Sequence, residues 1–136
     1  MEIKTHTDAD PKYLGAPVLI EDDREAEVEL MALGEMAVDG EGLIHQGFTF
    51  GLADYAAMLA VNHPNVVLGG AECKFLAPVR VGDLMKARAV VTSVKGGRRK
   101  IDVDICVDDR KVFSGIFDCH VLYRHVLDRR DDVEMK

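Results

Sequence analysis

The chain has 136 residues, enough for one domain with a substantial core, and its 48% hydrophobic and 30% charged content is ordinary for a globular protein. Its net charge of −7, with acidic residues gathered near both ends and no basic stripe, argues against binding to nucleic acid or to an anionic membrane. No signal peptide is visible, and no apolar run reaches the about 20 residues of a membrane span.

Three cysteines, Cys73, Cys106 and Cys119, each fall inside a predicted strand. An odd number of cysteines at such positions is typical of reduced, buried thiols and not of a disulfide framework. We therefore expect a cytoplasmic protein whose three thiols are free and buried.

Residues 1–24 contain two prolines and a glycine and show no sustained hydrophobic period. We expect them to form a loosely ordered lead-in to a domain that spans residues 25–125. From Glu25 to Val38, acidic and apolar residues first alternate, which predicts a half-buried strand, whereas the second half of this run fits a helix equally well. The last segment, residues 126–136, is polar and is expected to fray as a C-terminal tail.

The segment from Phe48 to Val61 predicts a long helix whose residues are apolar, small or neutral, with the single exception of Asp54. Asn62 suits the C-terminal cap of this helix, and Pro64 cannot continue it. A helix that is apolar on all faces is normally buried, and an unpaired buried charge costs several kcal/mol or forces the group to neutralise. Asp54 therefore either has a structural partner or lies at a cleft where a perturbed carboxylate is useful.

Four β-rich runs follow the helix and are separated by turn signals. Apolar and polar residues alternate in them, most clearly in the third, which predicts an antiparallel meander with one buried face. With the earlier strand, this predicts an α+β fold in which an antiparallel sheet of five to six strands wraps around one long central helix. The expected strands are Asn65–Ala77, Leu84–Val94, Arg99–Val107 and Lys111–Tyr123.

The apolar character of the central helix also predicts an oligomer. One sheet cannot cover a helix on every side, so a second copy of the protein is expected to complete its burial. We therefore expect a homodimer or a dimer of dimers.

The pattern H-x-G-F-x-x-x-L-A-D-x-A, from His45 to Ala56, resembles the hotdog-fold acyl-CoA thioesterases, and within them the branch named for phenylacetate degradation. In that branch an Asp lies nine positions after the His, which is the spacing from His45 to Asp54. The run FLAPVRVGDLMKARAVV, from Phe75 to Val91, resembles the second strand, turn and third strand of the same family. The resemblance covers roughly residues 25–123 and implies a hotdog fold, a coenzyme A thioester as substrate and no further cofactor.

Two residues depart from the family pattern. Gln46 stands where the family usually has Gly, and Asp39 stands where some members have an Asn that helps to hold substrate or water. An ionised Asp accepts hydrogen bonds but cannot donate them. The part from Val66 to His120 also resembles the malonyl-CoA-binding effector domain of a bacterial regulator of fatty-acid synthesis, which implies an alternative function as an acyl-CoA or malonyl-CoA sensor without catalysis.

The thioesterase resemblance implies roles for three residues: Asp54 as general base or nucleophile, the Gly47 N–H as oxyanion donor, and His45 in shaping the loop. His45 could equally do no more than fix the loop by a hydrogen bond to the backbone. Gly47 and Asp54 are seven residues apart, which is about 10 Å along a helix, so one chain cannot easily bring both to one carbonyl. We therefore expect two sites per dimer, each with Gly47 from one chain and Asp54 from the other.

Gln46 and Phe48, on either side of Gly47, are candidates for contact with the substrate, although a Phe at such a position is more often part of the core. The phosphates of coenzyme A need cations. The best candidates are in the run KGGRRK, which places Lys95, Arg98 and Arg99 around a Gly-Gly turn, and solvated hairpin charges are the alternative interpretation. Further options are Lys74, Arg80 and Arg88.

Other chemistries find little support in the sequence. The histidines and cysteines have no metal-ligand spacing, so we expect no metal site. No serine lies in a nucleophile elbow, and no glycine pattern matches a phosphate-binding loop.

Overall fold

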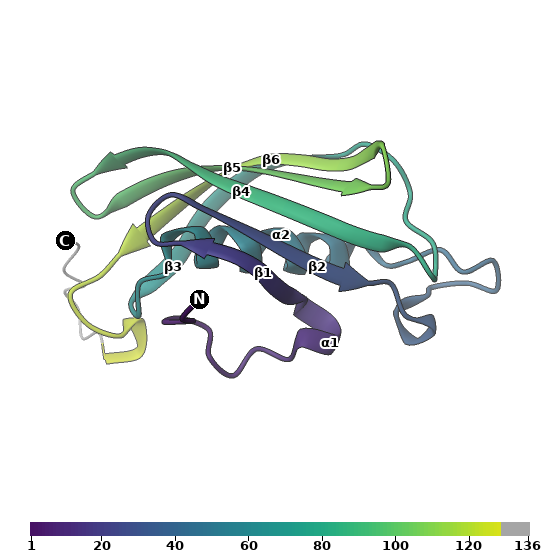
Figure 1. Ribbon diagram of the computed structural model, residues 1–136, viewed down its shortest axis with the longest axis horizontal. Helices are drawn as coiled ribbons and strands as arrows, with labels where there is room; N and C mark the ends of the chain where they lie inside the picture. Colours follow the sequence, from purple (N-terminus) through teal and green to yellow (C-terminus); the bar gives the residue numbers. More distant parts are fainter. Residues whose placement is uncertain (129–136) are drawn as a thin grey trace.

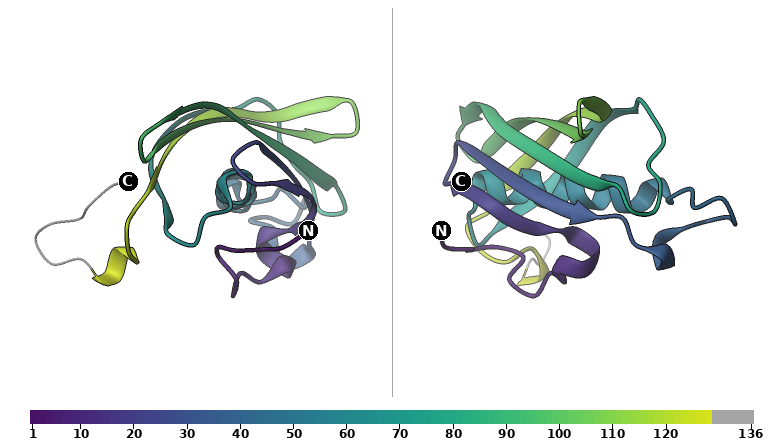
Figure 2. Two further views of the ribbon diagram at one scale, coloured as in Figure 1. Left: turned by 60° about the vertical axis from the view of Figure 1, so that its left-hand side comes forward. Right: turned by 45° about the vertical axis from the view of Figure 1, so that its right-hand side comes forward.

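The computed structural model describes residues 1–128 and confirms the expected α+β architecture (Figure 1). A six-stranded antiparallel sheet curves over the long helix α2, Gln46–Val61, which lies on its concave side (Figure 2, left). The strands are β1 Ala16–Glu21, β2 Glu25–Met31, β3 Val66–Phe75, β4 Leu84–Lys95, β5 Arg98–Val107 and β6 Arg110–Val121. All neighbouring strands pair in the antiparallel direction.

The strand order β1-β2-β4-β5-β6-β3 corrects the expected meander. Among the four strands after α2, only β4, β5 and β6 follow one another as hairpins, because just two residues separate each of these strands from the next, and such short loops force adjacency. The loop from residue 76 to residue 83 is long enough to carry the chain across the sheet. β3 therefore pairs with β6 at one edge, and β4 pairs with β2.

Residues 1–24 are not loosely ordered, contrary to the expectation from their irregular sequence. They form the short helix α1, Pro11–Leu14, and the edge strand β1. Asp10 caps α1 by accepting a hydrogen bond from the Lys12 N–H at 2.9 Å. This order comes from individual contacts and not from a repeating apolar pattern, which is why no period is visible in the sequence.

Gly15 marks the place where this segment comes closest to the sheet. Its φ of +103° lies in the region that favours glycine, and a Cβ here would lie 2.7 Å from Val28 Cγ1 and 2.9 Å from Glu29 O. Residues 1–15, called the N-terminal strap below, pass along the side of α2 that faces away from the sheet (Figure 2, left).

The run from residue 25 to residue 38 divides where its pattern changes. The strand expected in its first half is β2, and the second half contains only the 3-10 turn η1, Gly34–Met36. At the other end of the chain the short 3-10 turn η2, Val126–Asp128, begins the expected tail. The rest of that tail lies outside the described residues.

The second half of α2 is buried within a single chain. Every residue from Leu52 to Asn62 is buried except Asp54, which is half-buried. The sheet covers one side of the helix, and Ala9, Tyr13 and Leu14 of the strap pack against the same core. Within one chain the sheet and the strap thus bury the second half of the helix, whereas Gln46, Phe48 and Phe50 of its first half are half-buried. The expectation that a second copy completes the burial of this helix stays a prediction.

The three cysteines are free, as expected, but only Cys119 is buried. Cys106 alternates with the buried residues Ile105 and Val107 and so lies on the outer face of β5, and Cys73 lies on the edge strand β3. Both are half-buried, which corrects the expectation for these two thiols. Among residues 1–128, no helix is both long and apolar enough to cross a membrane.

Candidate functional site

Asp54 lies near the middle of α2, where burial raises the pKa of its carboxyl and a positive charge on His6 lowers it in part. Its Oδ1 is buried and has no hydrogen-bond partner among the described residues. Buried polar atoms are nearly always satisfied, so an unpartnered carboxylate oxygen calls for an explanation. A structural partner for Asp54 is not found within residues 1–128, whereas a perturbed carboxyl of this kind is typical of functional sites.

Cys119 on β6 is a close neighbour of Asp54. Burial, together with the negative charges of Asp54 and Asp118, raises the pKa of the Cys119 thiol to about 12. The thiol is therefore protonated at neutral pH and is a poor nucleophile. Of the two groups, the Asp54 carboxyl is therefore the candidate for chemistry.

His45 is the N-cap of α2, and its ring fixes the start of the helix. The ring Nδ1 accepts a hydrogen bond from the Gly47 N–H at 2.7 Å, and the backbone N–H of His45 donates to Met36 O at 3.0 Å. A Cβ on residue 47 would lie 2.8 Å from this Nδ1, so any other residue here would require the ring to shift. The Gly47 N–H, expected as an oxyanion donor, is already bonded in this chain, and the ring must move before a substrate oxygen can take its place.

The two neighbours of Gly47 have different surroundings. Gln46 is the first residue of α2 and is half-buried, with no side-chain hydrogen bond among the described residues. The ring of Phe48 lies 6.3 Å from the ring of Tyr13 and packs against the core. Phe48 thus connects the helix to the strap, whereas Gln46 is available to a ligand.

Asp39 organises its own loop. Its Oδ1 accepts hydrogen bonds from the Glu41 N–H at 3.0 Å and the Leu43 N–H at 3.2 Å. A cavity of about 470 Å³ lies beside it, lined by Asp39, Glu41, Leu43, Pro78 and Arg80. The Asp at this position therefore has a local structural role, which differs from the substrate contact made by Asn in some members of the resembling family.

The KGGRRK run forms the hairpin between β4 and β5, beside a cavity of about 150 Å³. Arg99 is held by Asp23, with 2.8 Å between Arg99 Nε and Asp23 Oδ1, and its side chain is only 11% exposed. Arg98 forms an ion pair with Asp118, with 3.6 Å between Arg98 Nη2 and Asp118 Oδ1. Lys95 is exposed and has no ion pair within residues 1–128, so it is the cation of the predicted set that is most available to a phosphate.

The hairpin and Gly47 lie at opposite ends of α2 in one chain. Asp23, which holds Arg99, donates its N–H to Val61 O at the C-terminal end of the helix. A helix of 16 residues is about 24 Å long. The structure therefore does not bring the predicted oxyanion donor and the predicted phosphate-binding cations together within a single chain.

The sequence model of the thioesterase superfamily matches residues 41–114, which include α2 and the strands β3 to β5. The chain belongs to the thioesterase superfamily. The curved antiparallel sheet around α2 is the hotdog fold expected from the resemblance.

Two curated relatives of this thioesterase-superfamily chain are longer proteins. It is 47% identical over 117 residues to a methylthioribose-1-phosphate isomerase from Aquifex aeolicus, a match that covers 86% of this chain and 25% of the isomerase. It is 31% identical over 85 residues to the transcription factor FapR from Caldanaerobacter subterraneus, which covers 62% of this chain and 42% of FapR. The chain thus spans less than half the length of either relative.

Solved structures show the same fold over most of the chain. The uncharacterized protein PH1136 from Pyrococcus horikoshii has 48% identity and a TM-score of 0.91, over 94% of this chain and 98% of that one. PaaI of the Escherichia coli phenylacetic acid degradation operon has 24% identity and a TM-score of 0.75, over 85% and 86% of the two chains. A hypothetical thioesterase from Streptococcus pneumoniae, solved with coenzyme A, has 18% identity and a TM-score of 0.76, over 88% and 95%. The last two likenesses show the fold alone.

The thioesterase-superfamily domain has one candidate residue that the sequence did not indicate. His6 lies in the strap, and its charge lowers the pKa of Asp54 against the larger, raising effect of burial. The two residues are 48 positions apart along the chain. Nothing in the local pattern around His6 distinguishes it from a surface histidine. Within residues 1–128 no group of three or more His, Cys, Asp and Glu side chains could hold a metal ion.

Proposed function

We propose that this domain hydrolyses a thioester of coenzyme A, with Asp54 as general base or nucleophile. The observation that carries the proposal is the half-buried, unpartnered carboxyl of Asp54 on the central helix of a thioesterase-superfamily domain. Burial raises the pKa of this carboxyl, so its ionised form is a stronger base than an exposed Asp. Hydrolysis needs a base that removes a proton from the attacking water, and a stronger base does this more readily.

In the general-base route, Asp54 takes a proton from a water molecule as the water oxygen attacks the thioester carbonyl. The carbonyl oxygen becomes an oxyanion, which the N–H groups at the start of α2 stabilise. The carbon–sulfur bond then breaks, and the thiol leaves with the proton that Asp54 returns. For Gly47 to donate to the oxyanion, its N–H must exchange His45 Nδ1 for the substrate oxygen.

A free sheet edge supports the proposal that a second copy of the chain completes the site. β3 pairs only with β6, so its other edge has no partner strand within residues 1–128. A ten-residue strand with a free edge is a ready template for pairing with another chain. Two residues of β3, Ala71 and Phe75, pair across the strands with Phe117 and Phe113 of β6. Both lie on the face of the sheet that is turned toward the helix, and both are exposed beside this free edge.

A two-fold dimer along this edge would place the two α2 helices antiparallel. The N-terminal end of one helix then meets the C-terminal end of the other, so Gly47 of one chain approaches Asp54 of its partner. The hairpin that carries Lys95 lies at the C-terminal end of its own α2 and would come to the same end as the partner's Gly47. In this arrangement Asp54 and the phosphate-binding cations come from one chain, and the oxyanion donor comes from the other.

The alternative function is binding of an acyl-CoA or malonyl-CoA without turnover. It is supported by the similarity to the transcription factor FapR over 85 residues. A pure binder has no need of a carboxylate beside the thioester, so Asp54 favours hydrolysis. The name of the isomerase belongs to a protein of which this chain matches a quarter, and it supplies no residue roles for the domain described here.

Free-thiol release from a panel of coenzyme A thioesters with short, long, aryl and malonyl groups tests the proposal. We expect hydrolysis of at least one class, because the base and the oxyanion donors act on the thioester and not on the acyl group. Calorimetric binding of the same thioesters is the companion measurement. Tight binding of any of them without thiol release would instead establish the sensor.

Mixed dimers test whether each site is shared between two chains. Gly47→Ala keeps the backbone N–H but places a Cβ 2.8 Å from the present position of His45 Nδ1, in the space that the substrate oxygen must enter. Asp54→Asn lacks the base, so both homodimers are expected to be inactive. A purified heterodimer of the two, isolated through different affinity tags, has one intact site of two and is expected to show about half of the wild-type activity per dimer.

The matched control is Gly40→Ala, because a Cβ on residue 40 meets nothing within 4 Å. Its homodimer is expected to keep wild-type activity, and its heterodimer with Asp54→Asn is expected to be half active. An inactive Gly47→Ala/Asp54→Asn heterodimer, with both controls active, would show that both groups come from one chain.

A further inference from the structure

A cavity of about 270 Å³, called the strap cavity below, lies just beyond the C-terminal end of α2. The strap and η2 lie on either side of the turn that joins α2 to β3 (Figure 2, left), and residues near both line the cavity. Among the described residues, no Lys, Arg, Asp or Glu side chain lines it. Its apolar lining consists of Pro64, Val66, Val67 and Val126.

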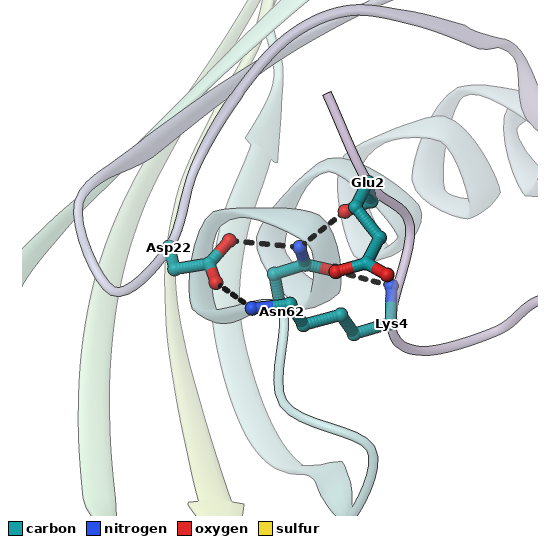
Figure 3. Close-up of polar contacts among 4 residues, drawn as sticks. All are labelled: Glu2, Lys4, Asp22 and Asn62. Atoms are coloured by element: carbon teal, nitrogen blue, oxygen red, sulfur yellow. Dashed lines mark hydrogen bonds and ion pairs between the residues drawn. The ribbon is translucent and has the colours of Figure 1, made fainter.

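The strap side of this cavity is held in place by contacts around His6. The Asn62 side chain, 2% exposed, accepts a hydrogen bond from the Lys4 N–H at 2.9 Å and donates one to Glu2 O at 2.7 Å (Figure 3). The φ of His6 is +52°, an uncommon value for a residue other than glycine, and such backbone is often found where a chain clamps a ligand. Thr5 Oγ1 lies 2.8 Å from His6 Nδ1, which leaves the Nε2 edge of the ring for the cavity.

The other polar groups of the strap cavity are equally well placed. His125 Nδ1 accepts a hydrogen bond from the Leu127 N–H at 3.0 Å, so the ring proton lies on Nε2 and can be donated. The backbone of Asn65 is fixed at both ends, because its N–H donates to His63 Nδ1 at 3.0 Å and its carbonyl accepts from the Leu122 N–H at 3.1 Å. Its side-chain amide makes no hydrogen bond within residues 1–128, so one donor and one acceptor are available together on a rigid backbone.

Three cations of the β4–β5 hairpin lie on the outer face of the sheet, around the cavity of about 150 Å³. Ile101 is buried on the face turned toward the helix, so Lys100 and Arg98, one and three positions before it, point to the outer face. Lys95 pairs with Arg98 and therefore shares this face. In the described part of the chain neither Lys95 nor Lys100 has an ion pair, so both can bind an anion.

The hairpin cations and the strap cavity are close together. Arg98 pairs with His120 of β6, and His120 pairs in turn with Val67 of β3, which lines the strap cavity. Two strand spacings, or about 10 Å, therefore separate the backbone of Arg98 from that of Val67. One extended ligand with an uncharged end and an anionic end can reach both places.

We propose that this end of the molecule binds an adenine nucleotide, with the base in the strap cavity and the phosphates on the hairpin cations. The strap cavity is slightly smaller than the about 300–1,000 Å³ of pockets for drug-sized ligands, and its apolar lining without charged side chains suits a flat, uncharged ring. The Asn65 amide can accept from N6 of adenine and donate to N7, and His rings stack on bases. Lys and Arg are suited to phosphates.

Two ligands have this chemistry in common: the nucleotide end of a coenzyme A thioester and a free adenine nucleotide. The first source rests on the proposed function, whereas the binding of the nucleotide itself does not.

Calorimetric titration of the full chain with ADP, GDP and pyrophosphate tests the base site. ADP is expected to bind about 10-fold more tightly than GDP or pyrophosphate, because only adenine satisfies both groups of the Asn65 amide. Asn65→Ala and the isosteric Asn65→Asp, which cannot donate to N7, are expected to lose this preference. A wild-type protein that binds ADP no more tightly than GDP or pyrophosphate would overturn the proposal, as would an unchanged preference in both variants.

Substitution of the cations tests the phosphate site. Lys95→Ala and Lys100→Ala are each expected to weaken ADP and GDP by the same factor, about 2- to 5-fold, and to leave the preference for ADP intact. The matched control is Lys111→Ala, because Lys111 is an exposed cation of β6 that lies nine positions, or about 30 Å, from His120. The control is expected to bind ADP as the wild type does. An equal loss in the control would show a general charge effect and overturn the assignment to the hairpin.

Competition with coenzyme A identifies the source of the nucleotide. If coenzyme A displaces ADP and Asn65→Ala weakens both, the site holds the nucleotide end of the substrate; if ADP stays bound, the site holds a free nucleotide. If ADP binds with the expected preference but the wild-type protein hydrolyses no thioester, the proposed function fails and the nucleotide site stands. If thioesters are hydrolysed but ADP does not bind at millimolar concentration, the nucleotide site is wrong and the proposed function stands.

Discussion

Asp54→Asn is expected to abolish thioester hydrolysis, with a fall in kcat/KM of about 10²–10⁴-fold. The amide has the shape of the carboxyl group but can neither take a proton from water nor attack the thioester carbon. Thiol release measures the loss. The control is Asp102→Asn, because Asp102 is exposed on the opposite side of β5 and has no ion pair among the described residues, so its variant is expected to keep full activity.

The same substitution is expected to leave the protein at least as stable as the wild type at neutral pH. Burial raises the pKa of Asp54 in the folded chain above its value in the unfolded chain. Stability from such a group is fully present below the unfolded-state pKa, where the carboxyl is protonated, and is lost as the pH rises through the folded-state pKa. The Asn side chain does not ionise, so Asp54→Asn does not lose stability in this way as the pH rises.

Denaturant unfolding of wild type and Asp54→Asn at neutral and acidic pH measures the difference in their free energies of unfolding and so checks its sign. The stability advantage of Asn is expected at neutral pH and should shrink in acid, where the wild-type carboxyl is also neutral. A variant that is markedly less stable at neutral pH would mean that the ionised carboxylate has a structural partner, and the proposed catalytic role would lose its support.

Asn62→Ala is expected to lower the free energy of unfolding by about 3 kcal/mol, the largest stability effect that we predict for one side chain. The substitution removes three side-chain hydrogen bonds, two of which hold the backbone of Glu2 and Lys4. It also places Ala at a φ of +53°, in the left-handed region that Asn tolerates better. Denaturant unfolding measures the loss.

Asn62→Gly separates the two causes, because glycine adopts the left-handed conformation freely but makes no side-chain bond. It is expected to lie between wild type and Asn62→Ala in stability. Both variants should release the strap, which faster amide hydrogen exchange in residues 1–15 would report. Wild-type exchange in the strap of either variant would show that Asn62 is not its anchor.

Much of the fold could be predicted because its repeating pattern is local. Alternation in the four later strands and the apolar run of α2 depend only on neighbours along the chain, so their positions agree with the structure to within a few residues. The pairing of β3 with β6 could not be predicted in this way, because a long loop allows either partner. The strap was missed for a related reason, since isolated contacts such as those of Gly15 produce no period.

The same distinction between local sequence patterns and contacts in three dimensions applies to the candidate site. The sequence by itself identified Asp54 as an ionisable group on a buried helix, and it indicated the His45–Gly47 start of that helix, because both features stand out from their immediate neighbours. Only the tertiary structure decided that His45 Nδ1 already accepts the hydrogen bond of the Gly47 N–H, that the strap packs against the same core as the helix, and that Asp54 Oδ1 is buried without a partner among the described residues. The His45 bond depends on the rotamer of one side chain. The other two features depend on residues far apart in the chain, because packing and electrostatic energies depend on distance in space and not on separation in sequence.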